Sequence, residues 1–345
     1  MKTDDFMAMK GAGYYSRATI GAKHVMDNAA GLILDALDRR PPADDGSVFQ
    51  MTDMGCADGG TSLDMVGRVL GDVRARCPSR PIRMTYTDLP RTDYSALFQL
   101  VHGVSGPPTY ASAIPDLYVD ASATSFHRQI VPAGTLDLGH SATASHYITE
   151  APAEIEDHVH MVRAEGPVRD AYRAKGAKDW EDFLLMRARE LKPGGFLALF
   201  NFGIDEEGRW LGDTGGVSMF DTFAALWRAM ADEGAITGDE FRATNFPQVY
   251  RTVDEFTAPL AAGPARDAGL TLEHVETRVV ACPFAAAHAR GDYADAAAFA
   301  KAYIPTLRSW SEPVFLAGLS SDRPVEERAA LVDEFYGRYE ALVAA

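Results

Sequence analysis

Two periodicities of apolar residues divide the chain into strands and helices up to about residue 204. Short strand-like runs lie at 48–53, 82–87 and 196–202, with weaker candidates at 117–119 and 135–139. Between these runs, apolar residues recur at helical spacing in the stretches 24–39, 61–76, 93–101 and 179–191. Strands that alternate with helices are typical of βαβ units. The pattern therefore predicts an α/β fold with a parallel sheet.

The alternation is interrupted by two long segments that the sheet does not require. The segments 152–178 and 205–258 are mostly helical in pattern and contain several aromatic residues. Because open α/β sheets bind ligands beyond the carboxyl ends of their strands, we expect both segments to form a helical cap there. The remaining ranges, expected to form the α/β core, are 1–151, 179–204 and 259–345. Near the C-terminus the pattern predicts a strand over 269–282 and helices over 294–310 and 325–343.

The acidic composition narrows the range of partners. Asp and Glu total 49 against 33 Lys and Arg, for a formal net charge of -16. Nucleic acids and anionic membrane surfaces select for basic residues, so we expect neither as a partner. No window approaches the roughly 20 apolar residues of a membrane span. The three cysteines Cys56, Cys77 and Cys282 match no zinc or redox spacing, so we expect a cytoplasmic protein without a metal site.

A glycine-rich motif follows the first predicted strand. It reads Asp53-Met-Gly-Cys-Ala-Asp-Gly-Gly-Thr and has the spacing G-x-x-x-G-G. Glycines at a strand-to-helix turn let the backbone approach a ligand closely. The dinucleotide fingerprint G-x-G-x-x-G and the P-loop are both missing. A nicotinamide-dependent oxidoreductase therefore stays only as an alternative, and the lack of a G-x-S-x-G elbow disfavours a serine hydrolase.

Two acidic residues end consecutive predicted strands. Asp53 ends the first strand and Asp88 the second. A carboxylate after the first strand suits a ligand with a cationic amine, and one after the second can accept both hydroxyls of a ribose. A pyrophosphate would be repelled by Asp53 and Asp58. The pair of acids therefore predicts S-adenosyl-L-methionine as the cofactor and S-adenosyl-L-homocysteine (SAH) as its product.

Several motifs carry a family resemblance. The Asp53 motif is similar to D-L-G-C-S-S-G-P-N-T, and Thr87-Asp-Leu-Pro-Arg-Thr-Asp-Tyr is similar to N-D-L-P-x-N-D-F. Four weaker matches follow in the same order, and they begin at Thr124, His140, Asn245 and Arg308. From about residue 9 to 340 the chain thus resembles the SABATH carboxyl and N-methyltransferases. Members of that family methylate salicylate, benzoate, jasmonate, indole-acetate and xanthine alkaloids.

The resemblance implies a fold and a set of site residues. The fold would be a Rossmann-like class I methyltransferase sheet with a helical cap over the active site. Residues expected to bind the cofactor are Tyr15, Thr19, Asp53, Gly55, Asp58, Asp88, Leu89, Ser125 and Phe126. Residues expected to bind the acceptor are Lys23, Thr143, His146, Tyr147 and Trp227, with His146 and Tyr147 as the catalytic pair. The family also implies a homodimer.

The sequence departs from the family at positions expected to bind the methyl acceptor. Ala22 stands where the family has a glutamine that binds the substrate carboxylate, with Lys23 next to it. Tyr147 replaces a tryptophan, and Thr143 replaces a tyrosine. The implied activity is methylation of the carboxylate of a small, aromatic or apolar organic acid. A phenolic oxygen or ring nitrogen as acceptor, or a catalytically silent cofactor-binding homologue, remain alternatives.

The chemistry of the acceptor decides what the histidine must do. A carboxylate is already ionised at neutral pH, with a pKa of roughly 4, so it needs alignment rather than a base. For a phenol or ring nitrogen, His146 could assist proton removal, because we expect its pKa to lie near the working pH. His158 and His160, in an H-x-H pattern on an expected helix, are predicted to lie on a solvated face and to bind no metal.

Overall fold

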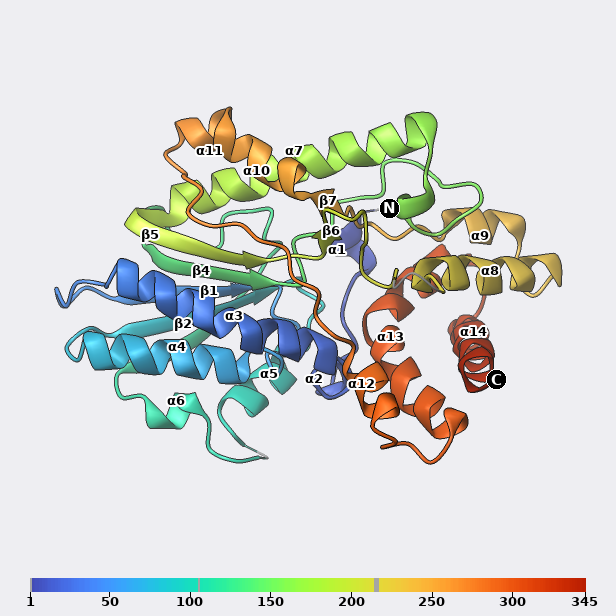
Figure 1. Ribbon diagram of the computed structural model, residues 1–345, viewed down its shortest axis with the longest axis horizontal. Coiled ribbons are helices and arrows are strands. Elements are labelled where there is room, and N and C mark those ends of the chain that lie inside the picture. The colour runs from blue at the N-terminus through green and yellow to red at the C-terminus, as the bar shows by residue number, and fades with distance from the viewer. Residues whose placement is uncertain (1, 105, 214–216) are drawn as a thin grey trace.

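A five-stranded parallel sheet organises one half of the molecule. The computed structural model describes residues 2–104, 106–213 and 217–345. The strands are β1 (Phe49–Met54), β2 (Ile82–Asp88), β3 (Leu117–Ala123), β4 (Leu136–Ala142) and β5 (Leu191–Phe200). They pair in parallel in the order β3-β2-β1-β4-β5 (Figure 1). The predicted α/β fold with a parallel sheet is confirmed.

The central strand is buried along its whole length. Every residue of β1 is shielded from solvent, as expected for a parallel sheet covered on both faces. Phe49 and Met51 pack with α3 (Ile20–Arg39) and α4 (Leu63–Arg76) on one face. Met54 packs with Trp180 and Phe183 of α7 on the other. This alternation follows from the period of two in an extended strand.

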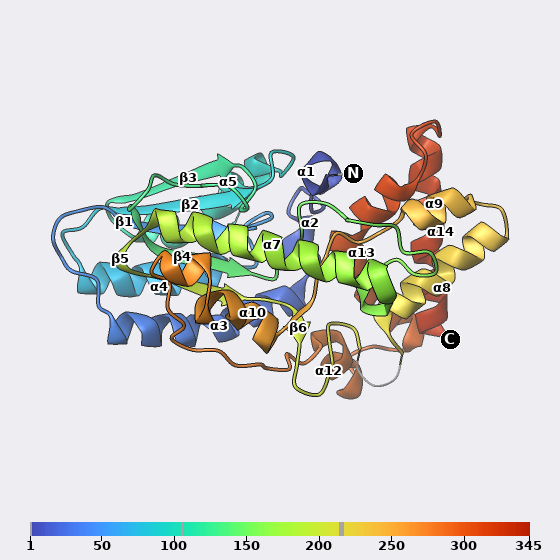
Figure 2. The same cartoon turned by 90° about the horizontal axis from the view of Figure 1, so that it is seen from above.

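Helix α7 (Gly166–Glu190) extends beyond the sheet. Its C-terminal half covers the sheet, and its N-terminal half reaches toward the helices at the other end of the molecule (Figures 1 and 2). The predicted boundary between cap and core, at 178/179, falls inside this continuous helix. Shorter elements complete the sheet half: α5 (Tyr94–Val101), α6 (Tyr110–Ala113), α10 (Val253–Ala261) and α11 (Pro264–Asp267). A small parallel pair joins β6 (Gly203–Ile204) to β7 (Arg251–Thr252).

The other half of the molecule is helical and has an aromatic core. Its helices are α8 (Met219–Asp232), α9 (Gly238–Ala243), α12 (Pro283–Ala289), α13 (Ala296–Gly318) and α14 (Val325–Ala344), and the short 3-10 helix Met161–Arg163 precedes α7. Phe223 of α8 lies edge-on to Phe315 of α13, with ring centroids 5.4 Å apart. The sequence pattern places the segment 259–345 in the α/β core. In the structure, α13 and α14 of this segment pack against α8 and α9 of the expected cap. Across the described ranges, no helix is long and apolar enough to cross a membrane.

The predicted strand over 269–282 is wrong. The structure describes all of these residues, and they carry no helix or strand assignment. Leu272 and Val279 are 46% and 74% exposed. Side-chain hydrogen bonds hold the segment instead. Arg40 donates to Glu273, and Thr277 donates to Glu206. A strand needs a neighbouring strand and a covering layer, and an alternating pattern alone does not show whether either exists.

The N-terminal arm ties the two halves together. It contains α1 (Thr3–Phe6) and α2 (Tyr14–Ala18). The Ser16 amide donates to Asp58 on the sheet side, at 3.0 Å. On the helical side, the Thr306 hydroxyl of α13 donates to the Ala18 carbonyl. The arm therefore lies between the glycine-rich loop and α13.

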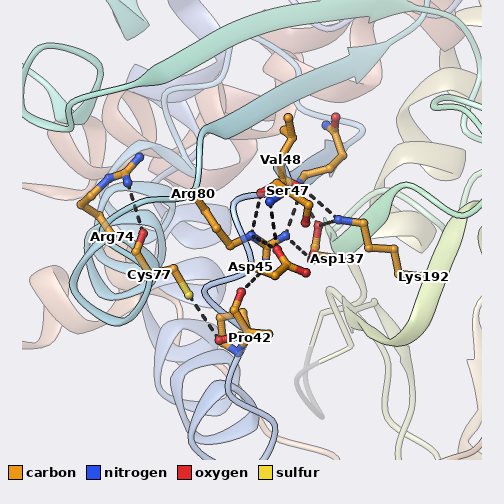
Figure 3. Close-up of polar contacts among 11 residues, drawn as sticks. Pro42, Asp45, Ser47, Val48, Arg74, Cys77, Arg80, Asp137 and Lys192 are labelled. Carbon is orange, nitrogen blue, oxygen red and sulfur yellow. Dashed lines mark hydrogen bonds and ion pairs between the residues drawn. The ribbon is translucent and has the colours of Figure 1, made fainter.

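A buried ion pair stabilises the end of the sheet at which β4 and β5 begin. The Arg80 side chain is 3% exposed, and its guanidinium lies 3.0 Å from Asp137 at the start of β4 (Figure 3). Arg80 also donates to the carbonyls of Ser47 and Val48, and Lys192 reaches the same Asp137 carboxylate at 2.7 Å. These contacts join the loop before β1 to the first residues of β4 and β5.

Replacing Arg80 with methionine should destabilise the fold strongly. Arg80→Met removes the guanidinium partner of the Asp137 carboxylate and a donor to the carbonyls of Ser47 and Val48, which should lower the free energy of unfolding by about 3–5 kcal/mol. Arg83→Met is the matched control, because Arg83 is 51% exposed and pairs with Asp120 at the surface; its cost should stay below about 1 kcal/mol. Urea denaturation measures both. Equal losses would contradict a structural role for the buried pair.

Candidate functional site

The glycine-rich loop after β1 passes very close to the end of β4. Gly55 has φ +81, and a Cβ at this position would lie 2.4 Å from the Ala144 Cβ. The Gly55 amide donates to the Thr87 carbonyl at the end of β2, at 2.8 Å. Only glycine fits both the left-handed conformation and the close approach. The ends of β1, β2 and β4 thus meet at one place.

Asp53 is a buried carboxylate at the end of β1. It is 1% exposed, and its Oδ2 accepts a hydrogen bond from the Ser62 hydroxyl at 2.6 Å. Its Oδ1 finds no hydrogen-bond partner within the described part of the chain. Burial, with a smaller contribution from the nearby Asp88 charge, raises the pKa of Asp53 to about 7. A cationic amine would neutralise this carboxylate and supply the missing donor.

Asp88 is oriented by the backbone at the end of β2. Its Oδ2 accepts from the Ala57 amide and its Oδ1 from the Leu89 amide, both at 2.7 Å. The Thr92 side chain also donates to this carboxylate, whose two oxygens offer about four lone pairs in all. Desolvation raises the pKa of Asp88 above its usual range. The carboxylate is thus held in one orientation with acceptor capacity to spare, as two ribose hydroxyls require.

Asp58 and Tyr15 connect the loop to the N-terminal arm. The Asp58 carboxylate accepts from the amides of Ser16 and Gly60, at 3.0 and 3.3 Å. Tyr15 is 8% exposed, and its hydroxyl lies beside the Thr143 side chain. Burial raises the pKa of Tyr15 well above its ordinary value. Asp58 therefore anchors the arm, and Tyr15 is the arm residue that reaches the ends of the strands.

Thr19 and Lys23 are occupied by contacts with neighbouring helices. The Thr19 hydroxyl lies 2.9 Å from the Ser309 hydroxyl of α13. The Lys23 ammonium pairs with Asp27 and Asp64 at 2.9 and 2.7 Å, on the surface between α3 and α4. Their predicted contacts with cofactor and acceptor stay predictions, and the structure gives both side chains a structural role.

The residues after β3 complete the cofactor side. Ser125 is 6% exposed. The Phe126 ring lies 3.7 Å from the Cβ position at Gly55 and packs edge-on to Phe183, with centroids 5.9 Å apart. Phe126 and Leu89 are both half-buried against the aromatic core of the helical half. An apolar wall beside Asp88 is suitable for a flat heterocycle.

His146 is a neutral, buried side chain. It is 2% exposed, and its Nδ1 has no hydrogen-bond partner among the residues that the structure describes. Burial, with a smaller contribution from the Arg251 charge, lowers the pKa of His146 to about 3. The expectation of a pKa near the working pH is therefore wrong for His146. The ring can align or donate, but it is a poor base.

Tyr147 and Thr143 lie beside this histidine. The Tyr147 ring centroid is 4.6 Å from that of His146, and its backbone forms an isolated bridge with Gln248. Burial raises the pKa of Tyr147 above its ordinary value, so the hydroxyl stays protonated. Thr143 has φ +51 and donates its amide to the Phe200 carbonyl at 2.8 Å. The structure thus brings these three predicted acceptor residues together.

Trp227 has a different place. It is fully buried in α8, and its indole N–H donates to the Thr244 hydroxyl at 2.9 Å. Its ring packs edge-on to Phe315 and Phe335, at 5.1 and 5.4 Å. These contacts make Trp227 part of the aromatic core, and its predicted contact with the acceptor stays a prediction.

The expectation of a solvated face for His158 and His160 is wrong. They are 7% and 0% exposed and lie in the loop before α7. His158 contacts Asp221 at 3.2 Å, and His160 stacks on Phe220 with centroids 3.9 Å apart. The prediction assumed that these residues lie on a helix, whereas this segment is not helical. Within the ranges described, no group of three or more His, Cys, Asp or Glu is placed to hold a metal ion.

Three residues of the site carried no predicted role. Gln248 and Tyr250 lie in the loop that leads into β7, Arg251 is the first residue of β7, and each is at most 2% exposed. The motif that begins at Asn245 indicates this loop in the sequence, because it follows the other family motifs in the expected order. Nothing in the sequence showed that the loop would pair with residues 146–148, which the structure places against it.

A parallel sheet with acids at neighbouring strand ends and a tight glycine loop defines a methyltransferase fold. The family model described as SAM dependent carboxyl methyltransferase matches residues 4–344. The chain therefore belongs to the S-adenosylmethionine-dependent carboxyl methyltransferases of the SABATH family.

Known proteins agree with this assignment. The chain is 27% identical over 251 residues to indole-3-acetate O-methyltransferase 1 of Oryza sativa subsp. japonica, covering 65% of this chain and 61% of that one. It is 23% identical to loganic acid O-methyltransferase of Catharanthus roseus, covering 70% of this chain and 67% of that one. A solved structure of loganic acid methyltransferase with SAH covers 96% of this chain and 94% of its own, with TM-score 0.71 and 18% identity. That similarity supports the fold.

A methyl group at Gly55 should weaken cofactor binding. Gly55→Ala places a side chain at φ +81 and against Ala144, so the loop must move. We expect SAH affinity to fall at least tenfold, about 1.4 kcal/mol, in calorimetric titration. Gly31→Ala on α3, where an added Cβ meets no atom within 4 Å, is the control and should bind SAH normally. Unchanged binding by Gly55→Ala would remove the loop from the site.

Binding of SAH should release a proton from Asp53. The free carboxyl is about half protonated near pH 7, and an ammonium group beside it favours the ionised form. SAH affinity should therefore rise with pH from about 5 to about 7.5. Titration in two buffers of different ionisation enthalpy measures the proton. Asp53→Asn should abolish the release and Asp120→Asn should not; release that survives in Asp53→Asn would assign it to Asp88.

Proposed function

We propose that this protein transfers the methyl group of S-adenosylmethionine to the carboxylate of a small organic acid and forms a methyl ester. Membership of the carboxyl methyltransferase family supports the reaction. Relatives are named for indole-3-acetate, loganic acid, anthranilate and gibberellic acid, which are all small carboxylic acids. The match spans 61% of the first of these relatives, so the activity of the whole chain is part of the proposal.

The cofactor site fits its proposed ligand. Asp53 presents Oδ1 to the ammonium group of the methionine moiety, and Asp88 presents its oriented carboxylate to the ribose hydroxyls. Phe126, Ser125 and Leu89 border the adenine. The cofactor supplies an electrophilic methyl on a sulfonium, and the protein's task is to align the acceptor with it and to exclude water.

The state of His146 favours a carboxylate as the methyl acceptor. A phenol or a protonated ring nitrogen must lose a proton during transfer, whereas a carboxylate has none to lose. Burial and the Arg251 charge hold the pKa of His146 at about 3, which makes proton removal unfavourable. A neutral His146 and a protonated Tyr147 can instead donate hydrogen bonds that position an anion. This observation carries the choice of acceptor.

Three finer features belong to the same proposal. The helical segments 152–178 and 205–258 would cover the acceptor, with α13 and α14 packed behind them. The N-terminal arm would close the cofactor side through Tyr15 and Thr19. A homodimer follows from the family resemblance, and a reducing, cytoplasmic location is supported by the three free cysteines.

Methyl transfer to carboxylic acids should give base-labile products. The protein is incubated with methyl-labelled cofactor and, in turn, indole-3-acetate, anthranilate or loganic acid. A methyl ester releases labelled methanol in mild alkali, whereas N-methyl and phenolic O-methyl groups stay attached. We expect labile label with at least one acid. Stable label would show transfer to nitrogen or phenolic oxygen, and no transfer to any acceptor would favour a silent homologue.

A further inference from the structure

A cluster of buried polar side chains lies next to the reacting end of the site. We call Gln248, His146, Tyr147, His160 and Tyr250 the Gln248 cluster. All five side chains are at most 8% exposed. The His146 ring lies 5.7 Å from the Tyr250 ring, and the His160 ring lies 4.9 Å from it. Five polar side chains from three segments thus lie side by side.

The cluster is short of hydrogen bonds. In the described part of the chain, partners are lacking for Gln248 Nε2 and Oε1, His146 Nδ1, His160 Nε2 and the Tyr250 hydroxyl. The Gln248 amide lies against the Tyr147 hydroxyl and the His160 ring, but neither amide atom has the geometry of a hydrogen bond. Buried polar groups in native proteins are almost always paired. A set of such atoms in one place indicates a polar ligand group between them.

Backbone contacts place the cluster beside the cofactor side. The Val249 amide donates to the His146 carbonyl, and the Ile148 amide donates to the Pro247 carbonyl, both at 2.8 Å. The loop that carries Gln248 is therefore fixed to residues 146–148. The same segment begins at Ala144, which touches the Gly55 position.

A buried cation stands behind the cluster. Arg251 is 2% exposed, and its guanidinium donates to the carbonyls of Ser145 and Gly176, at 3.2 and 2.7 Å. Among the described residues no carboxylate lies within ion-pair distance of it, although the Asp179 and Glu255 charges act on it from farther away. In a chain with a formal net charge of -16, this gives a local positive potential. Such a potential stabilises an anion held in a site with little water.

We infer that Gln248 holds the carboxylate of the acceptor, donating from Nε2 to the oxygen that is not methylated. This inference rests on the proposed function. Tyr250 and His160 offer further neutral donors, and Arg251 balances the charge without touching the nucleophile. A neutral amide suits this task because a direct ion pair would draw electron density away from the attacking oxygen. Ala22 of α3, which stands where the family has a glutamine that binds the substrate carboxylate, cannot supply such an amide.

The test compares an acid with its primary amide. The probe is whichever of indole-3-acetate, anthranilate and loganic acid the wild type esterifies fastest, together with the carboxamide of the same compound. Both are titrated into the SAH-saturated protein. Gln248→Leu removes the donor and should weaken acid binding at least tenfold while SAH affinity is unchanged. Gln248→Glu adds a repelling charge and should reject the acid but accept the amide, whose NH₂ donates to the new carboxylate.

Gln99→Leu is the matched control, because Gln99 is an exposed glutamine of α5, and it should bind the acid normally. If Gln248→Leu binds and esterifies the acid like the wild type, Gln248 is not the anchor, while the proposed function stands. If the wild type forms no base-labile product with any acid, the proposed function and this inference both fail. If Gln248→Leu also loses SAH, the acid-to-amide preference of Gln248→Glu decides, and an unchanged preference would overturn the inference.

Discussion

Two carboxylates with little water around them, Asp53 and Asp88, are the constraint on which the site depends. The parallel sheet places them at the ends of neighbouring strands, where each raises the cost of ionising the other. Backbone amides satisfy Asp88, and a single hydroxyl partly satisfies Asp53. The remaining electrostatic demand is met by a ligand with an ammonium group and vicinal hydroxyls. The close glycine loop is needed because that ligand must approach the backbone here.

The helical half makes this edge of the sheet a closed environment. Helix α7 spans both halves, and the N-terminal arm is bonded to Asp58 on one side and to α13 on the other. The aromatic core around Phe223 and Phe315 fixes α8 against α13. Exclusion of water follows from this packing. It is also the cause of the lowered pKa of His146, so the cover and the chemistry are linked.

The acceptor side combines neutral donors with one buried charge. Tyr147 stays protonated and His146 stays neutral, because burial disfavours the charged form of each. Arg251 adds a positive potential from behind the loop that carries Gln248. An acidic protein thereby provides a local environment in which an organic anion can be held without being neutralised by a direct ion pair.

The sequence by itself determined the sheet, the glycine loop and the two acids, because these depend on local periodicity and on residues at strand ends. An ordered set of motifs also singled out His146, Tyr147 and Thr143, which the structure brings together. The tertiary structure alone decided the pKa of His146, the burial of His158 and His160, and the core position of Trp227. It also decided that 269–282 has no strand partner and that the segment with Gln248 and Arg251 lies against residues 145–148. These properties depend on which segments meet in space, and no pattern along one segment contains that information.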